Sequence, residues 1–320
     1  MKNRCLLFIA LCFFCMPAVF GLTCANASPY KAPEKIKAVM VGDRLVDVAL
    51  SLGVVAEGVS VRASMWPKAD EIKVASQLLG CPNSVTVKHP EAIANFMKER
   101  GITRLILEKS LKFCLYKKQV NPVKVADLVK DVPGITIEYV DFSGGVVSGI
   151  AQVATLFGKQ ERGRHVAAAY EKAMKKVEVS LAEQQLGKRV LVLNGNYAAS
   201  GKTFIRVEAP GGYTDQYILN PLGCENVAGV MITDTMKVSK GHVPGGRLGW
   251  LAEVQPDVIV ATGNGFAVQL ALHKALKKNP ALADVPAIKN GAVYSLPFYG
   301  DSSVIEYPQI FKQWGTALGQ

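Results

Sequence analysis

The stretch between Gly144 and Gly187 constrains the fold most, because its apolar residues follow a continuous helical period. They recur every three or four positions and form one stripe, at Val166, Tyr170, Met174, Val177 and Leu181. A helix of about 25 residues, rising 1.5 Å per residue, is roughly 35–40 Å long. Residues 144–187 are therefore predicted to be a connecting helix that crosses between two lobes.

Strand-like and helix-like segments alternate on both sides of this stretch. Strands are predicted, in chain order, at 37–41, 58–61, 104–107, 135–140, 189–193, 258–261 and 292–296. Helices are predicted at 46–52, 90–100, 123–130, 214–222, 267–277 and 304–318. The alternation predicts an α/β fold of two Rossmann-like lobes with central parallel sheets, joined by one long α-helix. The N-terminal lobe is predicted at 28–143 and the C-terminal lobe at 188–320.

The beginning of the chain has the order of parts that is typical of a secretory signal peptide. Lys2 and Arg4 precede an apolar stretch, Leu6–Leu22, and Ala25-Asn26-Ala27 supplies a small-x-small cleavage site. Residues 1–27 are therefore predicted to be a signal peptide cleaved after Ala27. The mature protein is expected to be exported.

Two alternatives remain open for this segment. The apolar stretch approaches the length that spans a bilayer, so an uncleaved membrane anchor is one of them. The other is a lipoprotein anchored at Cys24, although the preceding Gly21-Leu22-Thr23 matches a lipid-attachment sequence poorly. The remainder of the chain has no further apolar stretch of spanning length, which predicts a soluble mature protein.

Three cysteines remain after the predicted cleavage, namely Cys81, Cys114 and Cys224. The oxidising compartment permits one disulfide and one free thiol, and Cys81–Cys114 is the predicted pair. Three buried free thiols are the alternative.

Several classes of function find no support in the residue pattern. The formal charge of +11 is spread along the chain without a dense basic run or a zinc-finger spacing, so no nucleic-acid binding is expected. The glycine-rich segment 195–203 has five residues, not the required four, before Gly-Lys-Thr, so it is no P-loop. The histidines are scattered and no catalytic triad spacing is apparent. The protein is expected to hold no resident metal or cofactor and to catalyse no reaction.

Three segments of the second half carry a family resemblance. They are Leu222-Gly223-Cys224-Glu225-Asn226-Val227-Ala228, Trp250–Val260 with its Pro256-Asp257-Val258-Ile259-Val260 end, and Pro286–Tyr294. In this order, around a long central helix, they resemble the substrate-binding proteins of metal-chelate ABC importers, the class that includes siderophore, cobalamin and haem binders. The resemblance covers nearly all of residues 36–318. In the first half, Gly101–Leu107 and the stretch 65–90 depart from the family's pattern.

The resemblance implies a monomeric periplasmic protein that captures a metal chelate between its lobes and delivers it to an ABC permease of the inner membrane. A ferric siderophore is the leading ligand, cobalamin or haem the second, and a molybdate-type oxyanion the third. Docking by acidic residues at the edge of each lobe is also implied. An extracytoplasmic enzyme or a sensory binding module of the same fold is the rival hypothesis.

Candidate ligand-binding residues follow from the topology, because ligands meet parallel α/β lobes at the loops after the strands. Arginine and lysine suit the anionic oxygens of a chelate, and aromatic rings suit its organic part. The predicted set combines both kinds with polar side chains: Arg44, Arg62, Trp66, Lys109, Tyr197, Arg206, Tyr213, His242, Asn264 and Tyr299.

Overall fold

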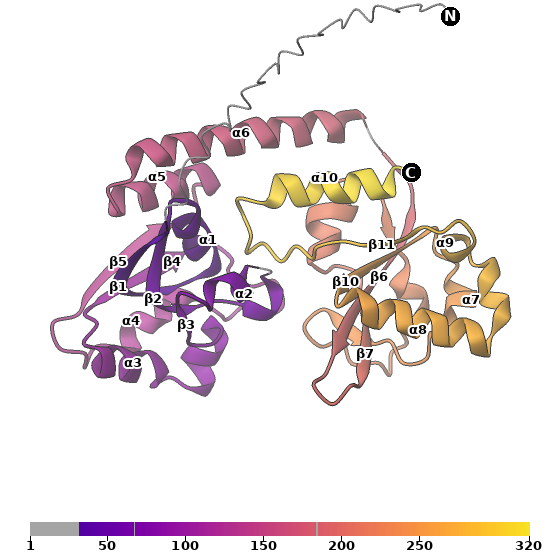
Figure 1. Ribbon diagram of the computed structural model, residues 1–320, viewed down its shortest axis with the longest axis horizontal. Helices are drawn as coiled ribbons and strands as arrows, with labels where there is room; N and C mark the ends of the chain where they lie inside the picture. The colour runs from indigo at the N-terminus through magenta and orange to yellow at the C-terminus, as the bar shows by residue number, and fades with distance from the viewer. Residues whose placement is uncertain (1–31, 67, 184) are drawn as a thin grey trace, which may run out of the picture. The chain divides into compact units, whose positions relative to one another are not determined.

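The computed structural model of the protein describes residues 32–320 except residues 67 and 184 (Figure 1). Pro33–Gln320 form one unit, to which everything below refers. The predicted signal peptide with its cleavage site and the two alternatives for it lie outside the described residues. Over the described ranges, no helix combines the length and the apolar character that crossing a membrane requires.

The first lobe is built on a parallel sheet with the strand order β3-β2-β1-β4-β5. Its strands are β1 (Glu34–Val41), β2 (Val54–Ser60), β3 (Gln77–Leu78), β4 (Arg104–Lys109) and β5 (Thr136–Asp141). Its helices are α1 (Asp43–Ser51), α2 (Ala69–Ile72), α3 (Ala92–Arg100) and α4 (Val125–Leu128). Single helical turns lie at Ala63–Met65, Ser84–Lys88 and Pro122–Lys124.

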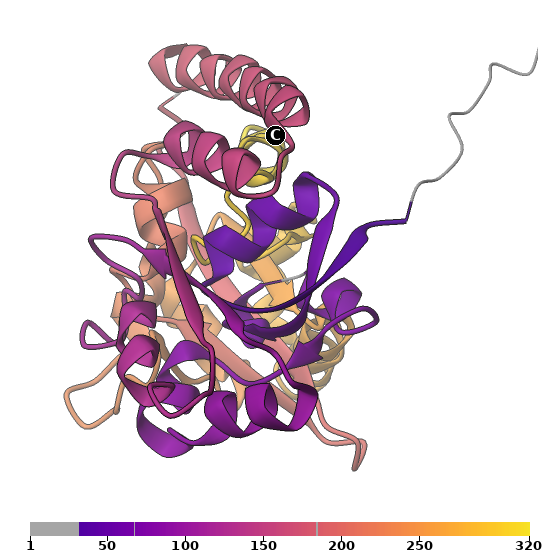
Figure 2. The same cartoon turned by 90° about the vertical axis from the view of Figure 1, so that its left-hand side faces the viewer.

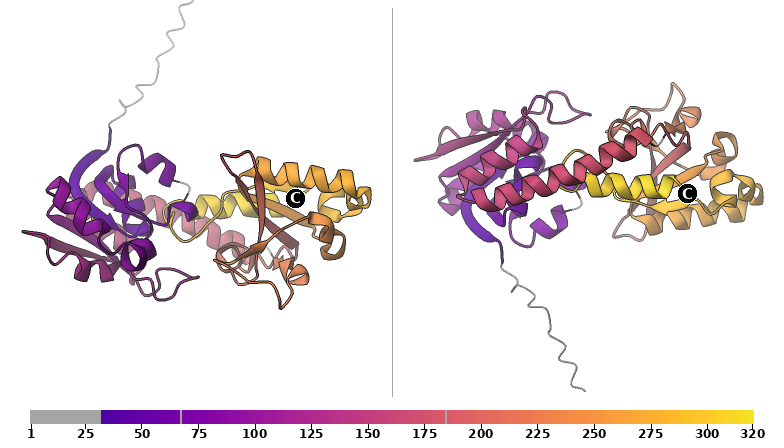
Figure 3. Two further views of the ribbon diagram at one scale, coloured as in Figure 1. Left: turned by 90° about the horizontal axis from the view of Figure 1, so that it is seen from below. Right: turned by 90° about the horizontal axis from the view of Figure 1, so that it is seen from above.

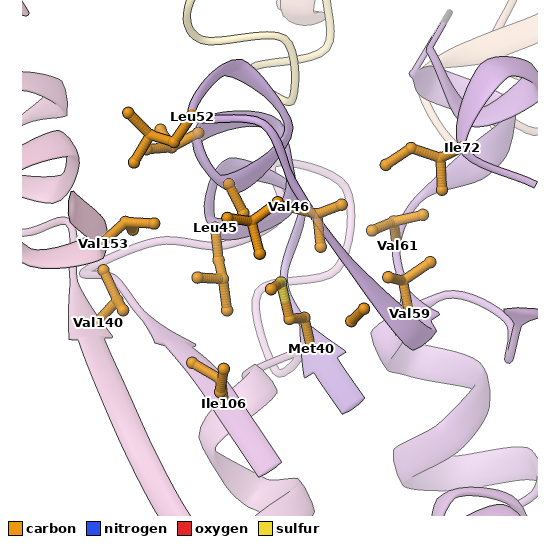
Figure 4. Packing of buried hydrophobic residues seen from close by; sticks show 14 of the residues in the cluster. Met40, Leu45, Val46, Leu52, Val59, Val61, Ile72, Ile106, Val140 and Val153 are labelled. Carbon is orange, nitrogen blue, oxygen red and sulfur yellow. The ribbon is translucent and has the colours of Figure 1, made fainter. Parts of the chain in front are cut away.

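Both faces of this sheet are covered, which explains the apolar runs Ala38–Val41 and Leu105–Leu107 in its central strands. On one face Met40 and Ile106 pack with Leu45 of α1 (Figure 4). On the other face Val39 and Leu105 belong to the cluster that includes the residues of α3 and α4. Parallel strands buried on both sides leave only their ends for a binding site.

The connecting region consists of two helices, α5 (Val146–Leu156) and α6 (Gln160–Glu183), so the prediction of one continuous helix over 144–187 is wrong. The break lies at Gly158, whose φ of 64° is the left-handed conformation that ends helices. A Cβ on Gly163 would stand 2.5 Å from that of Ala154, so glycine lets the two helices approach closely. Figure 2 shows α5 and α6 together at one edge of the first lobe.

The long helix α6 has 24 residues and contacts the cores of both lobes. Val166 packs against the core of the first lobe, and Val177 is buried in a core cluster of the second. A single long α-helix therefore joins the lobes, and the predicted fold class is confirmed.

The second lobe has a sheet in the order β11-β10-β6-β7-β9, with β8 also paired to β6. The strands are β6 (Arg189–Tyr197), β7 (Thr203–Glu208), β8 (Glu225–Asn226), β9 (His242–Pro244), β10 (Val258–Gly263) and β11 (Val293–Ser295). The helices are α7 (Leu251–Val254), α8 (Gly265–Lys278), α9 (Pro286–Lys289) and α10 (Tyr307–Leu318). Shorter helical segments lie at Asp215–Leu219, Val227–Met231, Leu248–Trp250 and Pro280–Asp284.

This second sheet is mixed and differs in that respect from the prediction of parallel strands. β6, β8, β10 and β11 are parallel, whereas β7 and β9 are antiparallel to their neighbours. The glycine-rich segment after β6 closes a hairpin, because the Ala198 N–H donates to the Lys202 carbonyl at 2.9 Å. A hairpin joins antiparallel strands, so β7 runs back beside β6.

A second connection between the lobes follows β11, inside the range predicted as the C-terminal lobe. Val304 is buried in the core of the first lobe, and the Ile305 N–H donates to Asp47 Oδ2 at 3.0 Å. The chain then returns as α10, whose Trp314 is buried in the second lobe. Figure 3 shows α10 beside α6. The two lobes are thus linked at two places along the chain.

The three cysteines of the described chain, Cys81, Cys114 and Cys224, are all free thiols. The predicted Cys81–Cys114 disulfide is therefore wrong, and the alternative of free thiols agrees with the structure. Cys114 and Cys224 are buried, whereas Cys81 is half-buried.

Candidate functional site

A cleft of about 810 Å³ lies where residues of the two lobes face one another at the strand ends. The first lobe contributes Ala63, Ser64, Met65, Trp66, Asp70 and Tyr116. The second contributes Asn194, Asn196, Arg206, Lys240, His242, Gly263, Asn264, Leu296, Pro297 and Phe298. Most of the second group lie at the carboxyl ends of β6, β10 and β11, the usual place for a ligand in such folds.

The lining of this cleft includes both aromatic side chains and cations. Trp66, Tyr116 and Phe298 supply rings, and Arg206 and Lys240 supply two positive charges. The acidic residue of the lining is Asp70, which is exposed and pairs with the Lys73 ammonium at 2.7 Å. The lining therefore favours an anionic ligand with a substantial organic part.

The second sheet holds the polar side chains of the cleft in place. Arg206 lies opposite Asn194 in the β6–β7 ladder and donates from Nη2 to its Oδ1 at 2.8 Å. Asn264 Oδ1 accepts from the Ala267 N–H at 2.9 Å and so caps helix α8. A Cβ on Gly195 would stand 2.1 Å from the Asn264 carbonyl oxygen, so glycine is needed for this close approach.

Two buried polar atoms of the lining have no hydrogen-bond partner among the described residues, namely Trp66 Nε1 and His242 Nε2. Both residues are more than 90% buried. Burial lowers the pKa of His242, and the nearby Arg206 guanidinium lowers it further, so the ring is neutral at pH 7. Buried polar groups are ordinarily satisfied, so these atoms are candidates for contact with a ligand.

Arg62, Arg44 and Tyr213 meet in a buried network that joins the lobes instead of lining the cleft. Arg62 Nε donates to Asp43, and its Nη2 donates to Asp301 Oδ1 at 2.7 Å. Arg44 pairs with Glu108 at 2.6 Å and with the other oxygen of Asp301 at 2.5 Å. Tyr213 belongs to the same network, because its hydroxyl accepts from Arg62 Nη1 at 2.7 Å.

The protonation states in this network follow from burial and pairing. Burial pulls the pKa of Arg62 down, yet Asp43 and Asp301 raise it well above its usual value. Burial raises the pKa of Glu108, and Arg44 opposes that effect. Both guanidiniums therefore stay charged and are occupied by protein carboxylates.

Tyr116 is a side chain of the first lobe that contacts the second lobe. Its ring lies 5.0 Å from that of Tyr213, edge to face, and its hydroxyl accepts from the Tyr213 N–H at 3.3 Å. It also hydrogen-bonds to the buried carboxylate of Glu208. Tyr116 therefore fixes one wall of the cleft across the lobe boundary.

The structure places the ten predicted site residues in three groups. Trp66, Arg206, His242 and Asn264 line the cleft. Arg44, Arg62 and Tyr213 form the buried network between the lobes. The last group lies outside both: Lys109 is exposed and pairs with Asp141 at 3.2 Å, Tyr299 packs in a tyrosine cluster, and Tyr197 is half-exposed beside Phe266.

Two α/β lobes with a ligand-sized cleft between them are typical of binding proteins. The family model described as "Periplasmic binding protein" matches residues 126–299, which is more than half of the chain. The chain belongs to this family of binding proteins, whose members are not enzymes, and the predicted membership is confirmed.

Solved structures support the fold at low sequence identity. The periplasmic haem-binding protein of Pseudomonas aeruginosa is 19% identical, with 88% of this chain and 91% of that chain covered and a TM-score of 0.51. The siderophore periplasmic binding protein of the fuscachelin gene cluster of Thermobifida fusca is 15% identical, with 91% and 98% covered and a TM-score of 0.54. The iron-uptake system-binding protein FeuA of Bacillus subtilis is 18% identical, with 87% and 94% covered and a TM-score of 0.52. A search of curated proteins finds no match.

Proposed function

We propose that the protein captures an anionic metal chelate, most specifically a ferric siderophore, in the cleft between its lobes. It then delivers the chelate to an ABC permease without changing it chemically, as an exported monomer. The observation that carries the proposal is the lining, in which Arg206 and Lys240 stand beside three aromatic rings in about 810 Å³. This volume is within the usual range of small-molecule sites, about 300–1,000 Å³.

The electrostatics of the lining favour a siderophore. Ferric chelates of catecholate or hydroxamate ligands present oxygen atoms around the metal, and many carry net negative charge. Arg206 offers a planar set of hydrogen-bond donors to such oxygens. The side-chain amides of Asn194 and Asn196 offer further donors. A small oxyanion such as molybdate would leave most of the cleft empty.

Haem is the second candidate, and the aromatic side of the cleft favours it. Trp66, Tyr116 and Phe298 offer ring surface to a flat macrocycle, while Arg206 and Lys240 suit its two carboxylates. One of the similar structures is a haem-binding protein and another is a siderophore-binding protein. Both classes therefore belong in the first experiment.

The test is a thermal-shift panel on residues 28–320 with ferric siderophores, haem, cobalamin, molybdate and free divalent metals. A ligand at a hundred times its Kd stabilises the folded state by about 2.7 kcal/mol. For a chain of this size that corresponds to a rise in Tm of roughly 4–5 °C. A shift with an iron chelate and none with its iron-free form is expected. A flat response to every chelate would contradict the proposal.

Removal of the two cleft cations is expected to weaken chelate binding. Arg206→Ala combined with Lys240→Ala should raise the Kd for an anionic ferric siderophore about 30–700-fold, because each of the two charged contacts contributes roughly 1–2 kcal/mol. Isothermal titration at two salt concentrations measures the change, and the wild type should show the steeper salt dependence. Lys109→Ala is the matched control, since that lysine is exposed outside the cleft. Equal affinities in the double variant and the control would exclude the assigned role.

A further inference from the structure

A groove of about 600 Å³ lies between α6 and α10, the two helices that Figure 3 shows side by side. In the described part of the chain, no residue that lines the cleft also lines this groove. Along α6 its lining recurs every three or four positions over residues 169–180, so it follows one face of that helix for about 16 Å. The groove is therefore a second, elongated hollow that a ligand in the cleft leaves free.

The floor of the groove is apolar. Ala169, Ala173 and Val177 come from α6, and Pro308 and Phe311 come from α10. Val177 and Phe311 are buried, so the floor lies below the surrounding surface. A flat bilayer does not reach a recessed floor, whereas a row of apolar side chains on a partner helix does. The two alanines, four positions apart, leave room for such a helix to come close.

Three lysines stand on the walls of the groove, Lys172 and Lys176 from α6 and Lys312 from α10. All three are exposed. Although α6 also carries the exposed acids Glu171 and Glu178, no Asp or Glu among the described residues lines the groove. The lining therefore has a net positive charge and favours an acidic partner.

A neighbouring hollow of about 380 Å³ extends this cationic surface along α6. It shares Lys172 and Lys176 with the groove and adds Lys175 and Val179. Val179 is 52% exposed, which leaves a large apolar side chain in water beside the cations. Exposed apolar surface bordered by charged residues is typical of protein interaction sites.

The spacing of the cations fits a helix better than a small anion. Lys172 and Lys176 are four positions apart on α6, so their Cβ atoms are about 6 Å apart, and Lys312 comes from the other helix. Carboxylates four positions apart on a partner helix have the same separation. One small anion would pair with only part of this set and would leave the apolar floor in water.

We propose that the groove between α6 and α10 binds an acidic amphipathic helix of a partner protein. The helix places its apolar stripe on the floor and pairs its flanking carboxylates with Lys172, Lys176 and Lys312. Because the groove and the cleft have separate linings, the protein holds this partner and a chelate at the same time. The inference goes beyond the proposed function and does not depend on it.

The probe is a labelled amphipathic peptide of about 20 residues, long enough to be helical, with a leucine stripe flanked by glutamates. Fluorescence anisotropy with residues 28–320 measures its Kd. Lys172→Glu, Lys176→Glu and Lys312→Glu together should raise the Kd about 10-fold or more, because three attractive contacts become repulsive. A second peptide with serines in place of the leucines keeps the charge and should bind about 10-fold more weakly or worse, because it leaves the floor uncovered.

The matched control reverses three exposed lysines of α8, Lys274→Glu, Lys277→Glu and Lys278→Glu, and so changes the net charge equally outside the groove. A second control, Arg206→Ala with Lys240→Ala, removes the cations of the cleft. Both controls should bind the peptide like the wild type. No binding to the wild type, or an equal loss in either control, would overturn the inference. Equal affinity for the serine peptide would reduce the groove to a general contact for polyanions. Binding to phosphatidylglycerol vesicles in place of the peptide would assign it to lipid headgroups, which also contradicts the proposal.

Discussion

Asp301→Asn is expected to destabilise the protein by about 2–4 kcal/mol and to lower its Tm by roughly 3–7 °C. The carboxylate of Asp301 accepts from two buried guanidiniums, those of Arg44 and Arg62. Asparagine retains one acceptor oxygen and turns the other position into a donor that faces an arginine. Each arginine keeps a second carboxylate, so the loss stays below the roughly 3–5 kcal/mol that follows removal of a sole partner.

Asp301→Asn removes the negative charge without straining the backbone. Asp301 has a φ of 54°, and asparagine tolerates this left-handed conformation. Urea unfolding of residues 28–320 at pH 7 measures the effect. Asp141→Asn is the control: Asp141 also pairs with a cation, Lys109, but that pair is exposed, so its loss should change the urea midpoint much less than Asp301→Asn does. Equal stabilities of the two variants would show that the buried network contributes nothing.

The buried network around Asp301 also limits how far the lobes can move relative to each other. Asp301 lies in the chain segment that leaves β11 and touches the first lobe, where Ser302 Oγ donates to the Met65 carbonyl at 3.1 Å. The long helix α6 and this segment after β11 both connect the lobes. Both resist hinge bending, because neither is a pair of flexible strands. We therefore expect small lobe motion on ligand binding, and a large closure between free and bound crystal structures would contradict it.

The sequence predicts the fold better than the site for a physical reason. Strand and helix patterns are local, and the buried run of β1 or the helix α8 is visible within a dozen residues. The sequence pattern does not reveal the break at Gly158, because the apolar period continues on both sides of it. The antiparallel direction of β7 was missed because the pattern of apolar residues along a strand does not reveal which way its neighbour runs.

The candidate site depends on contacts between residues far apart in the chain. A strand-end arginine can reach a ligand or a carboxylate, and Arg44 meets Asp301 across 257 positions, which no local pattern reveals. Tyr116 lies in an irregular segment after β4 without periodicity, so nothing marked it as a wall of the cleft. By contrast, Trp66, His242 and Asn264 reach the cleft because they lie in or beside the loops at its edge, and Arg206 reaches it from strand β7.

Glu208→Gln is expected to stabilise the protein at pH 8 by about 2–3 kcal/mol and to have little effect at pH 5. Burial raises the pKa of Glu208 to about 7, from an unfolded-state value near 4.5, with Asp215 adding to the shift. Between these two values the folded state holds a proton that the unfolded state has released. Stability therefore falls as pH rises through this window, and the penalty is complete above pH 7. Glutamine carries no charge to bury, so the variant lacks this penalty.

Urea unfolding at intervals from pH 5 to pH 8 tests the prediction. The wild type should lose stability toward pH 8, and Glu208→Gln should follow a shallower curve. Burial also raises the pKa of Asp47 to about 6. The stability of Glu208→Gln should therefore still fall somewhat as the pH rises. Glu225→Gln is the control, because Glu225 is an exposed acid in β8 and its neutralisation should leave the curve unchanged. The hydroxyls of Thr214 and Tyr116 can reorient to suit an amide, so lost hydrogen bonds should not mask the effect. Parallel curves for Glu208→Gln and the wild type would mean that this carboxylate is ionised throughout and that solvent reaches it.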